Sequence, residues 1–403
     1  MRRPLVLLLA AALLVAACGG DDDDAAAPDD TGSGDAAADT TTTTEAPEDE
    51  VRLNEIQVLG SHNSYHLRPE PDVRAGIAAV AGERVALELD YEHLPLTEQL
   101  EAHGIRQFEL DVYADPEGGR FADRPALAVL GRPTESGEAA LEEPGFKVLH
   151  QVDVDFRSTC LTLVACLTEI EAWSSSDPDH EPVMIMIETK QQSLPDAMGD
   201  DLDPALGIPW TEVLTFDRAL FDALEAEILS VFDRESIITP DDVRGDAATL
   251  EDAVLAGDAW PTLEDAAGKV LFSLVDLGPA RDTYVGDATN LEGRLLFTSS
   301  EEGRPDAALL RIDDPITEAD RIRAAVEAGY LVRTRTDVPG VDAVTGDTTR
   351  RDAAFESGAH YLSTDYYVAD ESLGYTLVVD LPGDGAARCN PVNAPEGCDL
   401  TSG

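Results

Sequence analysis

The sequence predicts an α/β fold closed into a (β/α)8 barrel of the TIM type, with room for irregularity. Short β-rich runs recur after residue 50, and helical patterns separate them. Several of the runs are apolar without strict alternation, as expected for parallel strands buried on both faces. An open doubly wound sheet is the alternative. That fold favours a glycine-rich phosphate loop after the first strand, whereas this loop reads GSHNSYH.

Eight strands and several helices follow from the pattern of apolar residues. We expect the strands at 55–59, 106–113, 146–151, 183–189, 269–275, 294–299, 330–336 and 360–366. We expect helices at 95–104, 167–176, 215–232, 318–329 and 348–359. Loop-rich sequence from about 190 to 260 separates the fourth and fifth strands, so an insertion is expected there.

The first 18 residues, MRRPLVLLLAAALLVAAC, predict a lipoprotein signal peptide. LVAAC resembles the bacterial lipobox, which implies cleavage before Cys18 and lipidation of its thiol; an ordinary signal peptide cut nearby is the alternative. Residues 19–50 are rich in acids and contain no base, which predicts a disordered, self-repelling linker. Residues 51–403 then form one folded domain. The protein is expected to be exported and anchored to the cell membrane at Cys18.

The formal net charge is −53, from 81 acidic and 28 basic side chains. A field of this sign repels nucleic acid and anionic membrane surfaces, so we expect no nucleic-acid partner. Nothing in the sequence indicates self-association, and a monomer is expected.

Four cysteines remain after Cys18, in two close pairs. In an exported protein this spacing predicts two local disulfides, Cys160–Cys166 and Cys389–Cys398.

Polar side chains follow each of the first four predicted strands. They are His62 and Asn63 after the first strand, Glu109 and Asp111 in the second, His150 after the third, and Glu188 and Lys190 at the end of the fourth. Because the C-terminal ends of barrel strands meet at one rim, we expect these side chains to converge.

The converging groups suit phosphodiester cleavage assisted by a metal ion. Asn63, Glu109, Asp111 and Glu188 offer only oxygen ligands, which favours Ca²⁺. His62 and His150 are suited to proton transfer near neutral pH.

The segments GSHNSYH, FELDVY, VLHQ and IMIETK, in that order, resemble the catalytic region of phosphoinositide-specific phospholipases C. The bacterial, secreted, calcium-dependent branch is the most similar, and the late LVRTRTD and YLSTDYY segments resemble that branch too. The resemblance extends from about residue 52 to 385. It implies cleavage of phosphatidylinositol-type lipids to diacylglycerol and a (cyclic) inositol phosphate.

Carried over to this sequence, the resemblance implies a role for each catalytic residue. His62 would stabilise the phosphorane-like transition state, and His150 would protonate the departing diacylglycerol oxygen. Glu109 or Glu188 would act as general base toward an inositol hydroxyl. The resemblance also implies that Asn63, Glu109, Asp111 and Glu188 bind Ca²⁺.

Four further residues are candidates for binding substrate: Lys190, Arg333, Arg335 and Asp365. The three cations suit anionic oxygens, and Asp365 suits an inositol hydroxyl. Structural ion pairs are an equally good interpretation of the cations, and closure of the barrel rim is the alternative for Asp365.

Two other functions stay open. A glycerophosphodiester phosphodiesterase or a sphingomyelinase-like lyase belongs to the same superfamily, but those enzymes usually carry HR where this chain has HN. A noncatalytic lipoprotein that binds a ligand on a barrel is the other alternative, and it leaves the two histidines unexplained.

Overall fold

The computed structural model describes residues 50–198, 206–370, 372–383 and 385–400. Eight parallel strands form a closed circuit: β1 (Ile56–Ser61), β2 (Gln107–Tyr113), β4 (Val183–Thr189), β6 (Val270–Leu274), β7 (Leu296–Thr298), β8 (Leu309–Arg311), β9 (Leu331–Arg335) and β10 (Tyr361–Thr364). β7 and β8 meet through the parallel bridge between Ser299 and Leu309. The predicted (β/α)8 barrel is confirmed.

One of the eight predicted strands is wrong. Residues 146–151 contain only β3 (Lys147–Val148), which pairs antiparallel with β2 and lies outside the circuit. The strand that completes the barrel is β8, in the segment DAALLRIDD. Three paired residues beside an aspartate-rich turn give too short an apolar run to identify from sequence, whereas FKVLHQ has the apolar pattern of a longer strand.

β11 (Ala387–Cys389) makes the barrel irregular between β1 and β2. It pairs antiparallel with β1, and Val58 faces β11 on one edge and β10 on the other. β11 therefore occupies part of the β1 edge that faces β2. Beyond β11, β1 pairs with β2 at Gly60, opposite Gln107. A Cβ on Gly60 would lie 2.0 Å from Gln107 Oε1, so only glycine permits this close approach.

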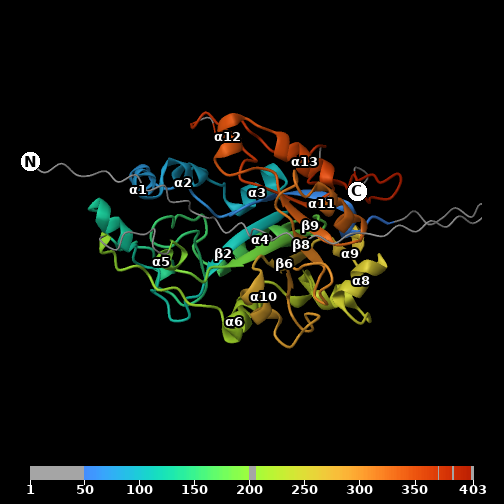
Figure 1. The fold of residues 1–403 in the computed structure, drawn as a ribbon. Helices are drawn as coiled ribbons and strands as arrows, with labels where there is room; N and C mark the ends of the chain where they lie inside the picture. The colour runs from blue at the N-terminus through green and yellow to red at the C-terminus, as the bar shows by residue number, and fades with distance from the viewer. Residues whose placement is uncertain (1–49, 199–205, 371, 384, 401–403) are drawn as a thin grey trace, which may run out of the picture.

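Helices surround the strands: α1 (Pro71–Ala81), α2 (Glu83–Glu88), α3 (Leu96–His103), α4 (Leu163–Ser176), α5 (Leu194–Met198), α6 (Arg218–Leu229), α7 (Pro240–Arg244), α8 (Leu250–Ala256), α9 (Leu263–Ala266), α10 (Gly278–Val285), α11 (Ala319–Glu327), α12 (Val341–Thr345) and α13 (Thr349–Ser357). Figure 1 shows α3, α11 and α13 along one side of the strands and α6 and α10 along the other. The five predicted helices are confirmed as α3, α4, α6, α11 and α13. Among the described residues, no helix is long and apolar enough to cross a bilayer.

The insertion expected at 190–260 is present. It holds α5 to α8 and a two-residue strand, β5 (Ile237–Ile238), which pairs with β6. Both predicted disulfides are also confirmed, Cys160–Cys166 and Cys389–Cys398. The predicted signal peptide, Cys18 and nearly all of the linker lie outside the described residues.

Two apolar cores hold the domain together. The larger lies inside the barrel and between the strands and their helices. The smaller lies beyond the C-terminal end of β2, where it joins α1, the loop after β2 and the loop after β3. We call it the rim core; its buried members are Val73, Tyr113, Phe121, Leu127, Leu149, Val152 and Phe156.

His360 ties β10 to its neighbours and makes stability depend on pH. Its Nδ1 accepts the Val332 amide at 3.0 Å, and its Nε2 lies 2.7 Å from the Asn54 carbonyl oxygen, so the ring is neutral with its proton on Nε2. Burial lowers the pKa of His360 to about 4. The unfolded chain therefore binds this proton first as the pH falls below about 6.5.

We expect the contribution of His360 to stability to be complete above pH 6.5 and to fall by about 2 to 3 kcal/mol by pH 4.5. Urea unfolding at both pH values measures it. A His360→Gln chain should be less stable than the wild type at pH 7.5, but its free energy of unfolding should fall less between pH 7.5 and pH 4.5. An equal pH dependence in the two chains would contradict the assignment.

Candidate active site

The predicted site residues gather at the C-terminal ends of the barrel strands. Glu109 and Asp111 lie in β2, Glu188 in β4, and Arg333 and Arg335 in β9. The others follow strands directly: His62 and Asn63 after β1, Lys190 after β4, and Asp365 after β10. Because all these strands are parallel, their side chains reach one rim.

Three carboxylates form the centre of the site. Glu109, Asp111 and Glu188 each offer an oxygen within 4.8 Å of the others. Asp111 is fully buried, Glu109 nearly so, and Glu188 is one-third exposed. Lys190 Nζ lies 2.8 Å from both Asp111 Oδ2 and Glu188 Oε1. The cluster therefore reaches solvent on the side of Glu188.

The carboxylate cluster has the properties of a cation site. Neither Asp111 oxygen has a hydrogen bond of good geometry among the described residues. Burial raises the pKa of Asp111 well above its usual range; the Glu188 and Glu109 carboxylates add to the rise and Lys190 opposes it. Burial alone would raise the pKa of Glu188, but the charge and hydrogen bond of Lys190, together with Arg311 and His150, lower it to about 2. A hard cation would ligate the Asp111 carboxylate, whose neighbour among the described cations is Lys190, and would relieve the repulsion around it.

Asn63 lies in the left-handed backbone region, with φ 46°, where asparagine is among the most tolerated residues. Its Nδ2 donates a hydrogen bond to the Tyr91 hydroxyl at 3.1 Å. The amide nitrogen is thereby engaged, so the amide oxygen is the atom that would meet a cation.

His62 is oriented by a carboxylate. Its Nδ1 lies 2.9 Å from Asp365 Oδ1, so Nδ1 carries the proton and Nε2 has the lone pair. Nε2 lies 3.8 Å from Glu109 Oε1. Burial, followed by the charges of Arg335 and Arg333, lowers the pKa of His62 well below its usual range. The ring is neutral at pH 7, and Nε2 can accept a proton.

His150 reaches the rim from outside the barrel, and not from the end of a barrel strand as predicted. It follows β3, and residues 151–155 turn back so that Gln151 pairs with Asp155. Asp155 Oδ2 lies 2.7 Å from His150 Nδ1 and 2.8 Å from His66 Nε2. Despite its burial, the two imidazoles hold the pKa of Asp155 below its usual range. The carboxylate stays ionised and fixes the proton of His150 on Nδ1.

Burial also lowers the pKa of His150, but the hydrogen bond to Asp155 opposes the shift. His150 is close enough to His62 that its charge lowers the pKa of His62. The site thus holds two imidazoles, each backed by its own carboxylate.

The cationic candidates are all in ion pairs. Arg333 Nη2 lies 2.7 Å from Glu109 Oε2, and its other terminal nitrogen pairs with Asp313. Arg335 Nη2 lies 2.8 Å from Asp365 Oδ2. Both arginines and Lys190 are therefore ion-pair partners of the site carboxylates. Structural ion pairs were one of the two interpretations that the sequence left open for them; substrate binding was the other.

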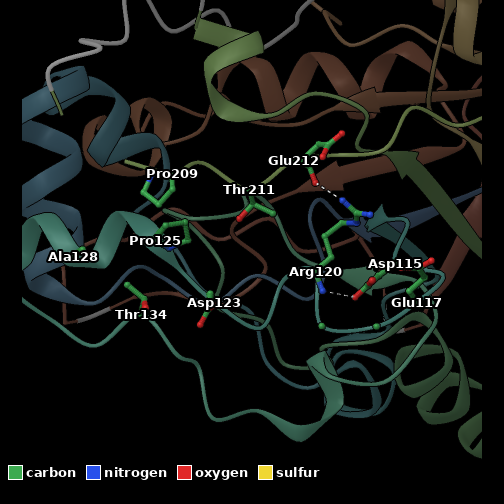
Figure 2. A pocket seen from close by; sticks show the side chains of 12 residues that line it. Asp115, Glu117, Arg120, Asp123, Pro125, Ala128, Thr134, Pro209, Thr211 and Glu212 are labelled. Atoms are coloured by element: carbon green, nitrogen blue, oxygen red, sulfur yellow. Dashed lines mark hydrogen bonds between the residues drawn. The ribbon is translucent and has the colours of Figure 1, made fainter. Parts of the chain in front are cut away.

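A cavity of about 640 Å³ lies beside the cluster of histidines and carboxylates and not over it. Figure 2 shows it between the loop after β2 and residues 209–212. The Arg120 amide donates to Asp115 within that loop, and Arg120 Nη1 donates to the Glu212 carbonyl. None of the predicted site residues lines it. Thr211 connects the cavity wall to the turn after His150, because both its amide and its hydroxyl donate to Asp153.

Three carboxylates that contact His150, Arg333 or Arg335 were not identified from the sequence. They are Asp155, Asp313 and Asp337. Asp337 accepts the Thr364 hydroxyl at 2.6 Å and pairs with Arg335 at 3.4 Å. Asp155 had a visible signal, since HQVDVDF places two aspartates in a turn directly after His150. Asp337 ends the LVRTRTD segment, but nothing in that segment marked it as a partner of the site residues, and Asp313 follows β8, a strand that was not predicted.

Comparison with family models identifies one family. The family model described as "Phosphoinositide phospholipase C, Ca2+-dependent" matches residues 51–391. No curated protein matches the chain significantly.

The solved structures to which the chain is similar are distant in sequence. A calcium-dependent phosphoinositol-specific phospholipase C from a Pseudomonas species is 16% identical, with a TM-score of 0.49 over 84% of this chain and 95% of that one. A Ca²⁺-dependent phosphatidylinositol-specific phospholipase C from Streptomyces antibioticus is 18% identical, with a TM-score of 0.47 over 79% and 95%. The family match spans almost all of the described residues. The chain belongs to the calcium-dependent phosphoinositide phospholipase C family, whose members are phosphodiesterases.

Proposed function

We propose that this protein cleaves the glycerol–phosphate bond of phosphatidylinositol-type lipids with the help of Ca²⁺, releasing diacylglycerol and a cyclic inositol phosphate. The observation that carries the proposal is a pair of carboxylate-backed imidazoles, His62–Asp365 and His150–Asp155, beside the cluster of Glu109, Asp111 and Glu188. That combination supplies proton transfer at two positions and charge stabilisation between them.

His62 is the better proton acceptor for the attacking inositol hydroxyl. Asp365 holds its proton on Nδ1, which leaves Nε2 free, and its lowered pKa keeps the ring neutral. Glu188 is a weaker base, because its pKa is lowered to about 2. Attack by a hydroxyl of the same inositol on its own phosphate is intramolecular, so proximity supplies part of the acceleration.

His150 is suited to protonate the departing diacylglycerol oxygen. Asp155 stabilises the imidazolium form, whereas the two arginines near His62 disfavour it there. Since Asp155 opposes the lowering of the pKa at His150 and the arginines add to it at His62, we assign the base to His62 and the acid to His150 in this proposal. The proton accepted at His62 and the proton released at His150 balance over one transesterification.

Glu109, Asp111, Glu188 and Asn63 would hold the calcium ion. When bound, Ca²⁺ would neutralise phosphoryl charge and lower the pKa of a hydroxyl that it contacts. In the chain itself, Lys190 pairs with Asp111 and Glu188, and Arg333 pairs with Glu109, so these cations offset the repulsion among the carboxylates. Lys190, at the exposed edge of the cluster, would also contact an anionic substrate oxygen. The Nε atoms of Arg333 and Arg335 are buried and have no hydrogen-bond partner among the described residues.

The N-terminal segment adds a proposal about location. The signal-like residues 1–18 and the acidic linker that follows support export and lipid anchoring at Cys18, with residues 51–403 as the catalytic domain. Radiolabelled palmitate should be incorporated by the wild type and not by a Cys18→Ser chain.

Product analysis tests the proposed function. Vesicles with inositol-labelled phosphatidylinositol should yield labelled cyclic inositol phosphate and diacylglycerol when Ca²⁺ is present. Glycerophosphoinositol and sphingomyelin serve as comparison substrates. Faster release of glycerol phosphate, or of choline with a cyclic ceramide phosphate, would favour the superfamily alternatives, and no turnover of any of the three would favour a noncatalytic protein.

A further inference from the structure

His66, the second histidine of GSHNSYH, is a buried imidazole to which the proposed reaction gives no role. Its Nε2 lies 2.8 Å from Asp155 Oδ2, and the same oxygen lies 2.7 Å from His150 Nδ1. An ionised carboxylate only accepts hydrogen bonds, so both ring nitrogens donate to this oxygen. His66 and His150 therefore share one acceptor.

The two imidazoles are the only hydrogen-bond partners of the Asp155 side chain among the described residues. Oδ2 accepts from both rings, and Oδ1 is buried without a partner. The last torsion of an aspartate side chain has a broad energy minimum, so a single hydrogen bond would leave the carboxylate free to turn. The hydrogen bond from His66 thus fixes the direction in which Oδ2 faces His150.

The ring of His66 is itself held firmly. It stacks on Tyr91, with ring centroids 4.3 Å apart and an angle of 29° between the planes. It also meets the ring of His150 edge to face, with centroids 5.6 Å apart. The backbone amide of His66 donates to the Asn63 carbonyl at 2.8 Å. Packing and the backbone therefore set the direction of Nε2 independently of Asp155.

The loop after β1 lies beside the segment that follows Asp155. His66 pairs with Ser158 in an antiparallel bridge, and the Thr159 amide donates to the Tyr65 carbonyl at 2.8 Å. The rim core supports the same turn through three of its members, Leu149, Val152 and Phe156. Paired backbones and packed side chains thus hold His66 and Asp155 at a fixed distance.

Both catalytic histidines therefore belong to groups of three. Asp365 contacts His62 through Oδ1 and Arg335 through Oδ2. Asp155 contacts His150, and His66 takes the place that Arg335 has at the other carboxylate. Each carboxylate is held by a second partner that does not depend on the catalytic ring.

We propose that His66 positions the general acid: by donating to Asp155, it holds the carboxylate that orients His150 toward the departing oxygen. This inference rests on the proposed function. His66 acts through Asp155 and is a positioning residue. An acid assists only when its N–H is directed at the oxygen that receives the proton, so a poorly oriented His150 would lose most of its effect. The loss should depend on how much the leaving group needs that proton.

Two water-soluble esters of inositol phosphate test this dependence. 4-Nitrophenol leaves as a stable anion and needs no proton, whereas hexanol, like diacylglycerol, must be protonated. A positioned acid contributes about 10²- to 10⁴-fold, so loss of a residue that orients it should lower kcat on the hexyl ester by about 10- to 100-fold. We therefore expect His66→Leu to show this loss on the hexyl ester and less than about a twofold change on the nitrophenyl ester.

Two further variants complete the kinetic test. His66→Gln should recover most of the activity on the hexyl ester, because the glutamine Nε2 can reach Asp155. His93→Leu is the matched control, since His93 is a buried imidazole that also packs against Tyr91, but its Nε2 faces the His62 carbonyl oxygen at 2.8 Å. Any loss in His93→Leu should be equal on the two esters.

Three kinetic results would overturn the inference. They are equal losses on both esters in His66→Leu, no loss on the hexyl ester, and a glutamine variant as slow as the leucine variant. Thermal melts establish that each variant is folded. If His66→Leu does not fold, His66→Met takes its place, because methionine is flexible enough to fill the space and donates no hydrogen bond.

Histidine-selective ¹H–¹⁵N NMR tests the same contact without turnover. The Nδ1–H signal of His150, hydrogen-bonded to Asp155, should be present in the wild type and in His66→Gln. It should move upfield or disappear through exchange in His66→Leu. An unchanged His150 signal in His66→Leu would contradict the inference. A wild type that turns over no inositol phosphate ester would defeat the proposed function, while these spectra still decide whether His66 holds His150 through Asp155.

Discussion

His62→Ala and His150→Ala should each lower kcat on phosphatidylinositol by about 10²- to 10⁴-fold, the usual contribution of a positioned acid or base. His62 would no longer accept the hydroxyl proton, and His150 would no longer protonate the departing oxygen. Both rings are about one-sixth exposed, so the fold should tolerate their removal. Steady-state kinetics with saturating Ca²⁺ measures the loss.

His103→Ala is the matched control, since His103 ends α3, outside the catalytic cluster. It should keep near wild-type activity, and thermal melts should show all three variants folded. If either active-site variant keeps more than about a tenth of the wild-type kcat, its ring is not the acid or base. The two losses should be far less than additive, because one proton transfer is of little use without the other.

Asp111→Asn should remove the response to calcium. Asparagine has nearly the same shape, but it lacks the charge that the buried Asp111 carboxylate offers. Mutation of a residue that only supports a metal ligand lowers metal affinity about 10- to 100-fold, so loss of a ligand itself should lower Ca²⁺ affinity by more. Calcium that binds the native state raises its stability, by about 2.7 kcal/mol at 100 times Kd. The wild-type Tm should therefore rise with Ca²⁺, and the Tm of the variant should not.

EGTA should silence the wild type, and excess Ca²⁺ should restore it. Asp123→Asn, in an exposed carboxylate that lines the cavity of Figure 2, should keep both responses. A Ca²⁺-dependent Tm in Asp111→Asn, or wild-type activity that is unaffected by chelator, would remove the carboxylate cluster as the calcium site.

Residues next to long strands were predictable from the sequence. QFELDVY and VMIMIET are seven-residue strands with strong apolar patterns, so the positions of Glu109, Asp111 and Glu188 relative to the sheet follow directly. Two-residue periodicity places Glu109 and Asp111 on one side. The ordered segments also resemble one family, and the family match confirms it.

Short strands and neighbouring partners were not predictable. β8 has three residues, and β3 resembles a barrel strand although it lies outside the circuit. His150 reaches the site all the same, because β3 pairs with the end of β2 and the turn to Asp155 holds the ring. The roles of Arg333 and Arg335 depended on which carboxylates lay opposite them.

By itself the sequence determined the barrel, the two disulfides and the residues at the ends of the strands, since strand periodicity, cysteine spacing and the order of motifs are local properties. Only the tertiary structure decided which carboxylate backs each histidine, and that the arginines are paired. Those contacts join segments up to 303 residues apart, such as His62 and Asp365, and they exist only once the barrel closes and brings β10 beside β1.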